Sequence, residues 1–260
     1  GLSATVGNPE EAGRFLVGSD RKFELIHDTS LRNYDVDVVF VPGKSNATPD
    51  EKIHEVANKI IDYVNKRQIT SPVLLFTNSR GESERLSSTL NQMGKIPIES
   101  HHGSLSRQVR EDTENKLREG ERGIVVCTSS LELGLDIGSV ELVIHYGSPR
   151  QVSKFMQRIG RSKHSKGDSA RGLIITENPD DEFEIQAIIE RIKEGSIEEQ
   201  KIHHGSLDIL AHHLVGLFQQ VILSKTVTEI SIDKALKLIK RAYPFQNITR
   251  EEIDDVLEFL

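Results

Sequence analysis

Four polar stretches of the sequence carry residue types that bind phosphate groups in proteins. In chain order they read LLFTNSRGESERL (74–86), SHHGSLSRQVRE (100–111), TSSLELGLDIGSVELVIHYGSP (128–149) and QRIGRSKH (157–164). Each lies at the end of a strand-like run or beside the start of a helix. Because the carboxyl ends of parallel strands line the ligand-binding crevice of an α/β sheet, we expect these stretches to form one site.

A metal centre is the alternative chemistry that the histidines suggest. Adjacent pairs lie at 101–102, 203–204 and 212–213, but neighbouring residues on a helix point in different directions. The single cysteine, Cys127, lies in the apolar run GIVVCT, where a small buried residue is expected. Neither a cysteine cluster nor H-E-x-x-H spacing occurs in the sequence. We therefore expect no metal site.

The elements that hold these stretches alternate between short apolar runs and amphipathic helical patterns from about residue 36 onward. This alternation is typical of a doubly wound α/β domain, in which crossover helices cover a parallel sheet. Strands are expected at 35–42, 73–77, 96–100, 123–128, 141–147 and 170–176. A capping box from Thr48 to Glu51 predicts a helix start, and Gly94 and Gly120 predict helix ends. The domain is expected to span residues 36–200.

Both ends of the chain differ from this pattern. LSATV has strand character and the following Asn-Pro-Glu-Glu run predicts a helix start, so residues 1–35 read as a separate segment. We expect this segment to pack on the α/β domain, pair with another chain or be poorly ordered, because its strand has no sheet to join. Residues 203–260 contain three helical patterns and a second capping box, Thr249 to Glu252. They predict a small, mainly helical module.

Composition limits the possible classes of function. With 36% hydrophobic and 28% charged residues, the chain is expected to be globular and soluble. No stretch approaches the roughly 20 apolar residues of a membrane span, and nothing resembles a secretory leader, so a cytoplasmic location without a membrane partner is expected. The net charge of -7 argues against an overall basic surface for nucleic acid, although a local groove can be positive on an acidic protein.

Taken together, the stretches resemble the second, RecA-like motor domain of a superfamily 2 helicase. The sequence is similar to the large helicase-related family, whose members carry GLSATVGNPEE, HGSLSR, TSSLELGxDIG and QRxGR almost as they stand here. Members continue into a winged-helix domain that begins much like SLDILAHHLVG and later reads RAYP, so the resemblance covers the whole chain. It implies an ATP-driven translocase on single-stranded nucleic acid, mainly DNA with 3'-to-5' polarity and sometimes hybrids with RNA, with a task in DNA repair or recombination.

The resemblance assigns the nucleotide side of the site to two of the stretches. In QRIGRSKH, Arg161 is the expected finger on the γ-phosphate, because phosphoryl transfer needs positive donors aimed at the developing charge. His164 stands where the common helicase pattern has its last arginine. The expected ATP-binding residues are Gly134, Asp136, Gln157, Gly160 and Arg161, and the expected catalytic residues are Arg161, Gln157 and His164. The alternatives are surface ion pairs for Arg161 and a helix-capping role for Asp136.

The track expected for the nucleic-acid backbone follows three strand ends, whose hydroxyl and backbone N–H groups suit phosphate without reading a base. Its residues are Thr77, Asn78, Ser79, Arg80, His102, Gly103, Ser104, Arg107, Thr128, Ser129 and Ser130. The alternative for Arg80 is an ion pair with Glu84, four residues further on. Ser3 and Thr5 of the SAT motif would couple the nucleotide state to strand binding. With 5% aromatic residues and no tryptophan, base stacking is expected elsewhere in the whole protein.

Two motifs of an ATP site are absent from the sequence. Neither G-x-x-x-x-G-K-[ST] nor a D-E-x-H acid box for Mg²⁺ occurs. Both precede the SAT strand in the first motor domain of related helicases, so residues 1–35 are expected to be the tail of that first RecA-like domain and the linker. The resemblance therefore implies a piece of a helicase that uses ATP and Mg²⁺, that is inactive alone, and whose partner is the missing first motor domain. Two other hypotheses stay open: a stand-alone, non-catalytic nucleic-acid-binding module, and an α/β enzyme acting on a small molecule.

Overall fold

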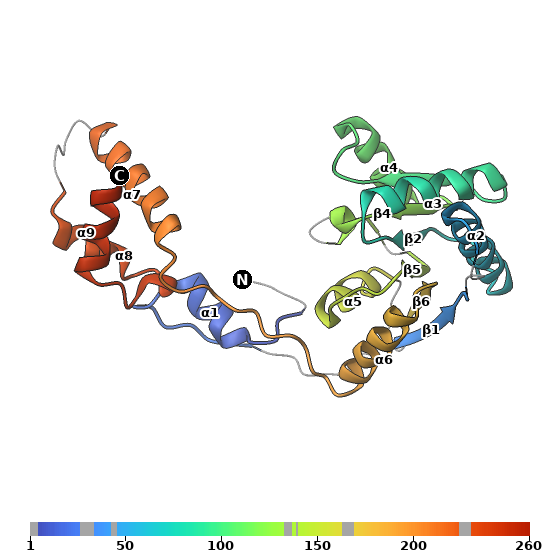
Figure 1. Ribbon diagram of the computed structural model, residues 1–260, viewed down its shortest axis with the longest axis horizontal. Coiled ribbons are helices and arrows are strands. Elements are labelled where there is room, and N and C mark those ends of the chain that lie inside the picture. The colour runs from blue at the N-terminus through green and yellow to red at the C-terminus, as the bar shows by residue number, and fades with distance from the viewer. Residues whose placement is uncertain are drawn as a thin grey trace. The chain divides into compact units, whose positions relative to one another are not determined.

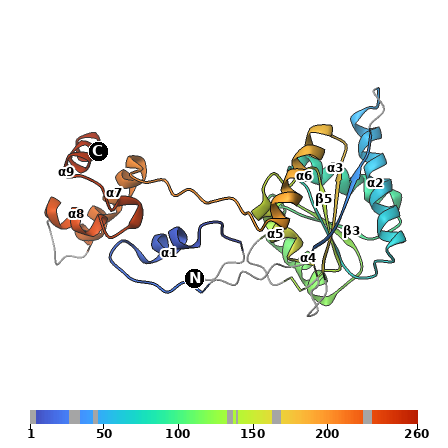
Figure 2. The same cartoon turned by 90° about the horizontal axis from the view of Figure 1, so that it is seen from below.

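A computed structural model describes residues 5–26, 34–42, 46–132, 137–138, 140–162, 169–223 and 230–260. The chain forms two compact units. The sheet unit consists of Ser30–Glu198, and the helical unit consists of Gly1–Thr29 together with Glu199–Leu260. Figure 1 labels the elements of both units, and Figure 2 shows them from below.

Six strands are described in the sheet unit, and all of them run parallel in the order β1-β6-β5-β2-β4-β3. Their bounds are β1 Tyr34–Phe40, β2 Val73–Phe76, β3 Ile98–His101, β4 Ile124–Cys127, β5 Leu142–Tyr146 and β6 Ala170–Thr176. The strands β2 and β4 are buried along their whole length, as expected when helices cover both faces of a parallel sheet. The predicted doubly wound α/β fold is therefore confirmed.

Helices cover both faces of this sheet. Because successive side chains of a strand point to opposite faces, Leu75 and Ile144 pack with α2 (Pro49–Lys66) and α3 (Arg80–Met93). On the other face, Leu74 packs with α4 (Arg107–Glu119), and Ile174 packs with α5 (Val152–Ile159) and α6 (Pro179–Lys193). In Figure 2, α2 lies on one side of the sheet and α5 and α6 lie on the other.

Local sequence signals fix where these helices begin and end. The Thr48 hydroxyl accepts a hydrogen bond from the Glu51 backbone N–H at 3.3 Å, so the predicted capping box is present. Gly94 ends α3 and Gly120 ends α4, both with left-handed backbone angles (φ 62° and 75°) that glycine adopts without strain. Within the described residues, no helix combines the length and apolar character that crossing a membrane requires.

The helical unit contains the three helices predicted near the C-terminus. They are α7 (Leu207–Leu223), α8 (Ile232–Ile239) and α9 (Arg250–Phe259), with the short 3-10 helix η2 (Tyr243–Phe245) between the last two. Their core is formed by Leu210, Leu214, Ile248, Ile253 and Val256. The Thr249 hydroxyl accepts the Glu252 backbone N–H at 3.2 Å, as the second capping box predicts.

The packing expected for residues 1 to about 35 requires correction. Residues 1–4 lie outside the described residues, Thr5 and Val6 are in no strand, and the predicted helix is α1 (Pro9–Val17). Residues 5–26 belong to the helical unit and not to the sheet unit. The reason is a two-way amide contact: Asn8 Nδ2 donates to the Gln200 carbonyl at 2.7 Å, and the Gln200 N–H donates to Asn8 Oδ1 at 2.9 Å.

Candidate nucleotide and nucleic-acid site

Glu132 and Arg158 form a buried ion pair that joins the third and fourth polar stretches. Arg158 Nε lies 3.0 Å from Glu132 Oε1, and the two side chains are only 5% and 7% exposed. The Arg158 guanidinium also lies 5.0 Å from the centre of the Phe76 ring. The Val140 N–H donates to the Arg161 carbonyl at 3.2 Å, which adds a backbone contact between the same two stretches. Sequence reasoning missed this pair, because its two charges look like surface residues in the sequence.

Arg161, the expected finger, follows the end of α5. Its Nη2 donates to the Glu132 backbone carbonyl at 3.0 Å, so Glu132 contacts Arg158 with its side chain and Arg161 with its main chain. Gln157 lies in the last turns of α5 and is partly buried. At Gly160 a Cβ atom would lie 2.9 Å from the Met156 carbonyl, so the structure gives this glycine a packing role within the helix end.

Several expected residues cannot be placed. Ser3, Gly134, Asp136 and His164 lie outside the described residues, and their roles remain predictions. Thr5, the other coupling residue, is buried in the helical unit.

The expected nucleic-acid track follows three neighbouring strands. Because β4 pairs with both β2 and β3, the segments beginning at Thr77, His102 and Thr128 leave adjacent strands at the same edge. Arg80 Nη1 donates to the Ser104 hydroxyl at 2.9 Å, which directly joins two of these segments. The structure thus brings the predicted track residues together at the carboxyl edge of the sheet.

The two cations of the track are exposed and paired. Arg80 Nε donates to Glu84 at 2.7 Å, so the ion pair considered from the sequence is present beside the Ser104 contact. Arg107 Nε donates to Glu111 at 2.6 Å, and the Arg107 side chain is 86% exposed. Each arginine could exchange its carboxylate for a phosphate oxygen at small cost, because exposed pairs of this kind stabilise a protein weakly.

Several hydroxyls of the track hold the loops themselves. The Thr77 hydroxyl donates to the Ser79 carbonyl at 3.0 Å, and the Ser79 hydroxyl caps α3 by accepting the Glu82 N–H. The Ser130 hydroxyl donates to the His101 carbonyl at 2.8 Å. Ser129, Ser104 and Gly103 are exposed at the same edge. The exposed surface at this edge therefore consists of these residues, Asn78, Ser79 and the two arginines, while the buried Thr77 and the partly buried Ser130 hold the loops beneath it.

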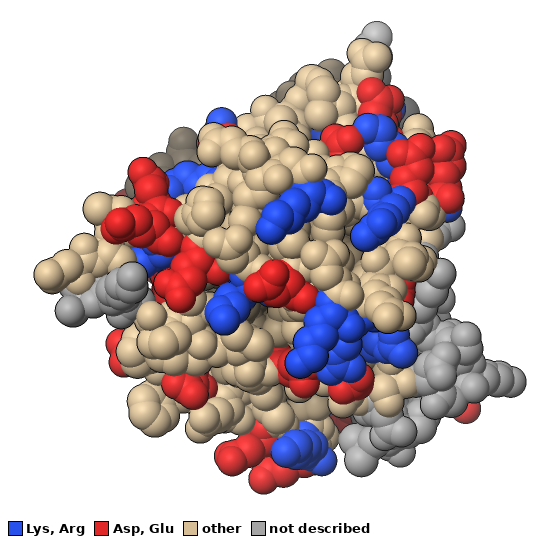
Figure 3. Space-filling model, turned by 90° about the vertical axis from the view of Figure 1, so that its right-hand side faces the viewer, with Lys and Arg blue, Asp and Glu red and all other residues tan. Residues whose placement is uncertain are grey.

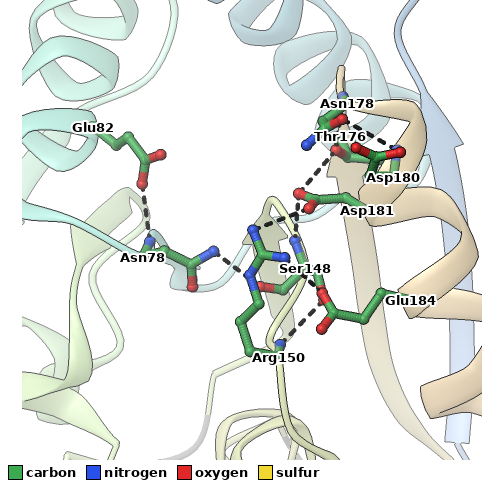
Figure 4. A network of polar contacts seen from close by, with 9 residues as sticks. All are labelled: Asn78, Glu82, Ser148, Arg150, Thr176, Asn178, Asp180, Asp181 and Glu184. Carbon is green, nitrogen blue, oxygen red and sulfur yellow. Dashed lines mark hydrogen bonds and ion pairs between the residues drawn. The ribbon is translucent and has the colours of Figure 1, made fainter.

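A polar network continues this edge toward β5 and β6 (Figure 4). Asn78 Nδ2 donates to the Ser148 carbonyl at 2.9 Å, and the Ser148 N–H donates to Asp181 Oδ2 at 3.0 Å. Arg150 Nη2 lies 3.0 Å from Asp181 Oδ1, and its Nη1 donates to Glu184 at 2.8 Å. The predicted contact residue Asn78 thus also holds the loop after β5. Arg150 was not predicted, because its left-handed backbone (φ 66°) leaves no signal in the sequence.

Burial determines the protonation of groups beneath the site. Burial, with a smaller effect of the Arg158 charge, lowers the pKa of His145 well below its usual range, so this imidazole is neutral near pH 7. Burial likewise raises the pKa of the Cys127 thiol, which agrees with the predicted buried, unreactive cysteine.

On the face seen in Figure 3, positive and negative side chains are interspersed and form no continuous surface of one sign.

The fold and the site define the class of protein. Residues 51–165, which include β2 to β5 of the parallel sheet, match the family "Helicase conserved C-terminal domain". Residues 190–260 match "Large helicase-related protein, winged helix domain". The chain thus combines the RecA-like helicase C-terminal fold with winged-helix sequence, and it belongs to the large helicase-related family.

Similar proteins support this assignment over the whole chain. The ATP-dependent helicases Lhr-Core of Methanocaldococcus jannaschii and Methanothermobacter thermautotrophicus are each 36% identical over 100% of the chain. The chain spans 30% of the length of each of these relatives. A solved structure of Mycobacterium smegmatis helicase Lhr bound to ssDNA and AMP-PNP is similar with a TM-score of 0.86 at 31% identity, covering 99% of this chain and 33% of that one.

Proposed function

We propose that this chain supplies the second motor domain of an ATP-dependent translocase on single-stranded nucleic acid. The proposed substrate is a DNA strand, along which the protein moves in the 3'-to-5' direction. The proposed task is DNA repair or recombination. The observation that carries the proposal is the Glu132 junction, where the segment that leaves β4 beside the track meets Arg158 and Arg161. The related helicase Lhr, whose structure holds both ssDNA and AMP-PNP, supports the same pairing of ligands.

In this proposal the two ends of one segment contact two ligands. Thr128 and Ser129 belong to the proposed nucleic-acid track, whereas the Glu132 carbonyl accepts the guanidinium of Arg161 on the proposed nucleotide side. A guanidinium that moves onto a γ-phosphate stabilises the charge that develops during transfer. Because Glu132 contacts Arg161 directly, that movement changes the position of the same segment at the track. Such a difference in contacts between two states is what conversion of ATP energy into strand movement requires.

The test removes the proposed finger from the full-length protein. Arg161→Ala is expected to lower ATP turnover by about a thousandfold and to leave single-strand affinity nearly unchanged, because the finger acts on the transition state. Arg171→Ala is the matched control, since Arg171 is an exposed arginine on β6 whose Nη1 lies 3.8 Å from Glu141. Turnover and strand affinity would be measured for both variants. Equal loss of turnover and affinity in Arg161→Ala would show that Arg161 is structural.

We also propose that the chain does not hydrolyse ATP alone. Its sequence contains no phosphate-binding loop and no acid box, so the groups that hold ATP and Mg²⁺ would come from the remaining part of the whole protein. The purified 260-residue chain is expected to show no turnover, with or without single-stranded DNA. A phosphate-release assay measures this directly. Sustained turnover by the purified chain would contradict the proposal.

A further inference from the structure

The N-terminal segment is fastened to the end of α8 within the helical unit. The Ser19 N–H donates to the Arg241 carbonyl at 2.9 Å, and the Ser19 hydroxyl donates to the Lys240 carbonyl at 2.5 Å. Gly18 has a left-handed φ of 89°, and a Cβ atom on it would lie 2.4 Å from the same Arg241 carbonyl. Arg241 Nε in turn pairs with Asp20 at 3.2 Å. These contacts give residues 18–20 a defined position.

A pocket of about 400 Å³ opens beside this attachment. It is lined by two segments of the helical unit, and its lining residues are Arg14, Gly18, Ser19, Arg21, Lys22, Phe23, Tyr243 and Gln246. We call it the basic pocket. Its volume falls in the range of pockets that hold one small molecule or one nucleotide of a strand.

The cations of the basic pocket lack carboxylate partners. Among the described residues, no Asp or Glu oxygen lies within ion-pair distance of Arg14, Arg21 or Lys22, whereas the neighbouring Arg241 is paired with Asp20. Three like charges around one pocket repel one another, and this repulsion is relieved when an anion binds between them. Guanidinium and ammonium groups together suit phosphate oxygens.

The aromatic residues of the pocket are held in place by their neighbours. The Phe23 ring packs so closely against α1 that a Cβ atom on Gly13 would lie 2.3 Å from it. The Tyr243 ring contacts the His204 ring edge-to-face, with the centres 5.1 Å apart. Rings fixed in this way lose little entropy when a base stacks on them. The pocket therefore combines phosphate donors with platforms for a base.

We propose that the basic pocket binds a nucleotide of a single-stranded nucleic acid, through its phosphate and its base. The ligand class rests on the proposed function, but the site is separate from the sheet unit. It provides aromatic surface for base stacking, whereas Phe76 at the end of β2 is fully buried. Free mononucleotide and inorganic phosphate share part of this chemistry, and the experiment distinguishes them from a strand.

The first arm measures binding of a fluorescent oligothymidylate to the 260-residue chain over a range of salt concentrations. Arg21→Ala/Lys22→Ala is expected to weaken binding at least tenfold. It should also reduce the slope of log affinity against log salt by about 1.4, the value for two phosphate contacts at about 0.7 each. Lys95→Ala/Arg122→Ala is the matched control, since these exposed cations lie before β3 and β4 and removing them changes the net charge equally. Unchanged binding by the pocket variant, or an equal loss in the control, would overturn the proposal.

The second arm maps the site by cross-linking. An oligothymidylate that contains 4-thiothymidine is expected to form adducts with Phe23 or Tyr243, and AMP or inorganic phosphate at the same phosphate concentration should not suppress them. Suppression by AMP or by phosphate would show a mononucleotide or anion site, and adducts confined to residues 77–107 would show no strand in the pocket; each result overturns the proposal. Neither arm needs ATP turnover, so a failure of the Arg161 test would leave both readouts interpretable.

Discussion

Glu132 contacts two arginines of the next polar stretch, Arg158 with its side chain and Arg161 with its main chain. Its carboxylate pairs with the Arg158 guanidinium, and both side chains are buried. A buried ion pair of this kind adds little net stability, since removing two charges from water offsets most of their attraction. Its effect is on position: the pair fixes the main chain whose carbonyl holds Arg161. We therefore regard Arg158 as a positioning residue for the proposed finger.

The buried pair gives a prediction that unfolding experiments can check. Arg158→Met should lower the free energy of unfolding of the sheet unit by about 3–5 kcal/mol, because it leaves the Glu132 carboxylate buried without its partner. The double variant Arg158→Met/Glu132→Leu should recover most of this loss, since no charge is then buried. Urea unfolding followed by circular dichroism measures these two variants and the single variant Glu132→Leu. Simple addition of the two single-variant effects in the double variant would show that the two side chains are not coupled.

At the residue scale the sequence predicts which side chains gather at the sheet edge but not which partner each one takes. Serine suits both a phosphate and a helix cap, and only the structure shows that Ser79 caps α3 and that Ser130 holds His101. For Arg80 the ion pair with Glu84 is present beside the Ser104 contact, and its role at a nucleic-acid backbone stays a prediction. Arg158 was missed because its partner Glu132 is 26 residues away in the chain.

At the element scale, signals contained within a few residues of sequence were predicted well. The boxes at Thr48 and Thr249 and the glycine ends of α3 and α4 depend on neighbouring residues alone, so they can be read from the sequence. Strand positions were predicted because parallel strands covered on both faces are continuous apolar runs. The packing of residues 5–26 could not be read in this way, because it depends on contacts with residues about 200 positions away.

The edge strand β1 is connected to α2 by hydrogen bonds to the Asp37 carboxylate, and their contribution to stability depends on pH. Asp37 Oδ2 accepts the Tyr63 hydroxyl at 2.7 Å and Arg67 Nη2 at 2.5 Å, and these partners, the Tyr63 hydroxyl first, lower the pKa of Asp37 against an opposing effect of burial. A lowered pKa in the folded state means that the stabilisation is present above the unfolded value of about 3.9 and is lost as the pH falls through the folded value. The contact therefore stabilises the attachment of β1 to α2 near neutral pH.

Asp37→Asn should accordingly reduce stability at pH 7 by about 0.5–1 kcal/mol, a small effect because the Asp37 side chain is 42% exposed. The difference from the unsubstituted chain should shrink as the pH falls below the unfolded value of about 3.9 and should disappear once the pH is below the lowered pKa of Asp37 in the folded chain. Thermal unfolding at several pH values measures it, with Asp62→Asn on the exposed side of α2 as the control. A difference that stays constant with pH would exclude the charge of Asp37 as its source.

At the scale of the whole molecule, the helical unit is assembled from both ends of the chain. In the sequence the sheet unit is inserted between Thr29 and Glu199, so the contacts of Asn8 with Gln200 and of Ser19 with Arg241 close a long loop of chain that includes it. Closing a long loop costs entropy that only slowly increases with length, so a few well-formed contacts are enough to hold it. The boundary near residue 200 could be predicted from the change in pattern. That residues 5–26 belong to the helical unit could not be predicted, because the contacts that hold them use backbone carbonyls, which every residue type carries.

The attachment of residues 18–20 to the end of α8 can be tested by substituting Gly18. Gly18→Ala should destabilise the helical unit by roughly 1–3 kcal/mol, because alanine is strained at φ 89° and its Cβ would lie 2.4 Å from the Arg241 carbonyl. Gly216→Ala in α7 is the matched control, since no described atom lies within 4 Å of the added methyl group and alanine favours a helix. Hydrogen exchange should show faster exchange in α8 and η2 of Gly18→Ala, with β2 and β4 unchanged. Because the two units have separate cores, equal loss of protection in both would contradict their assignment as independent units, and no loss in α8 would contradict the attachment itself.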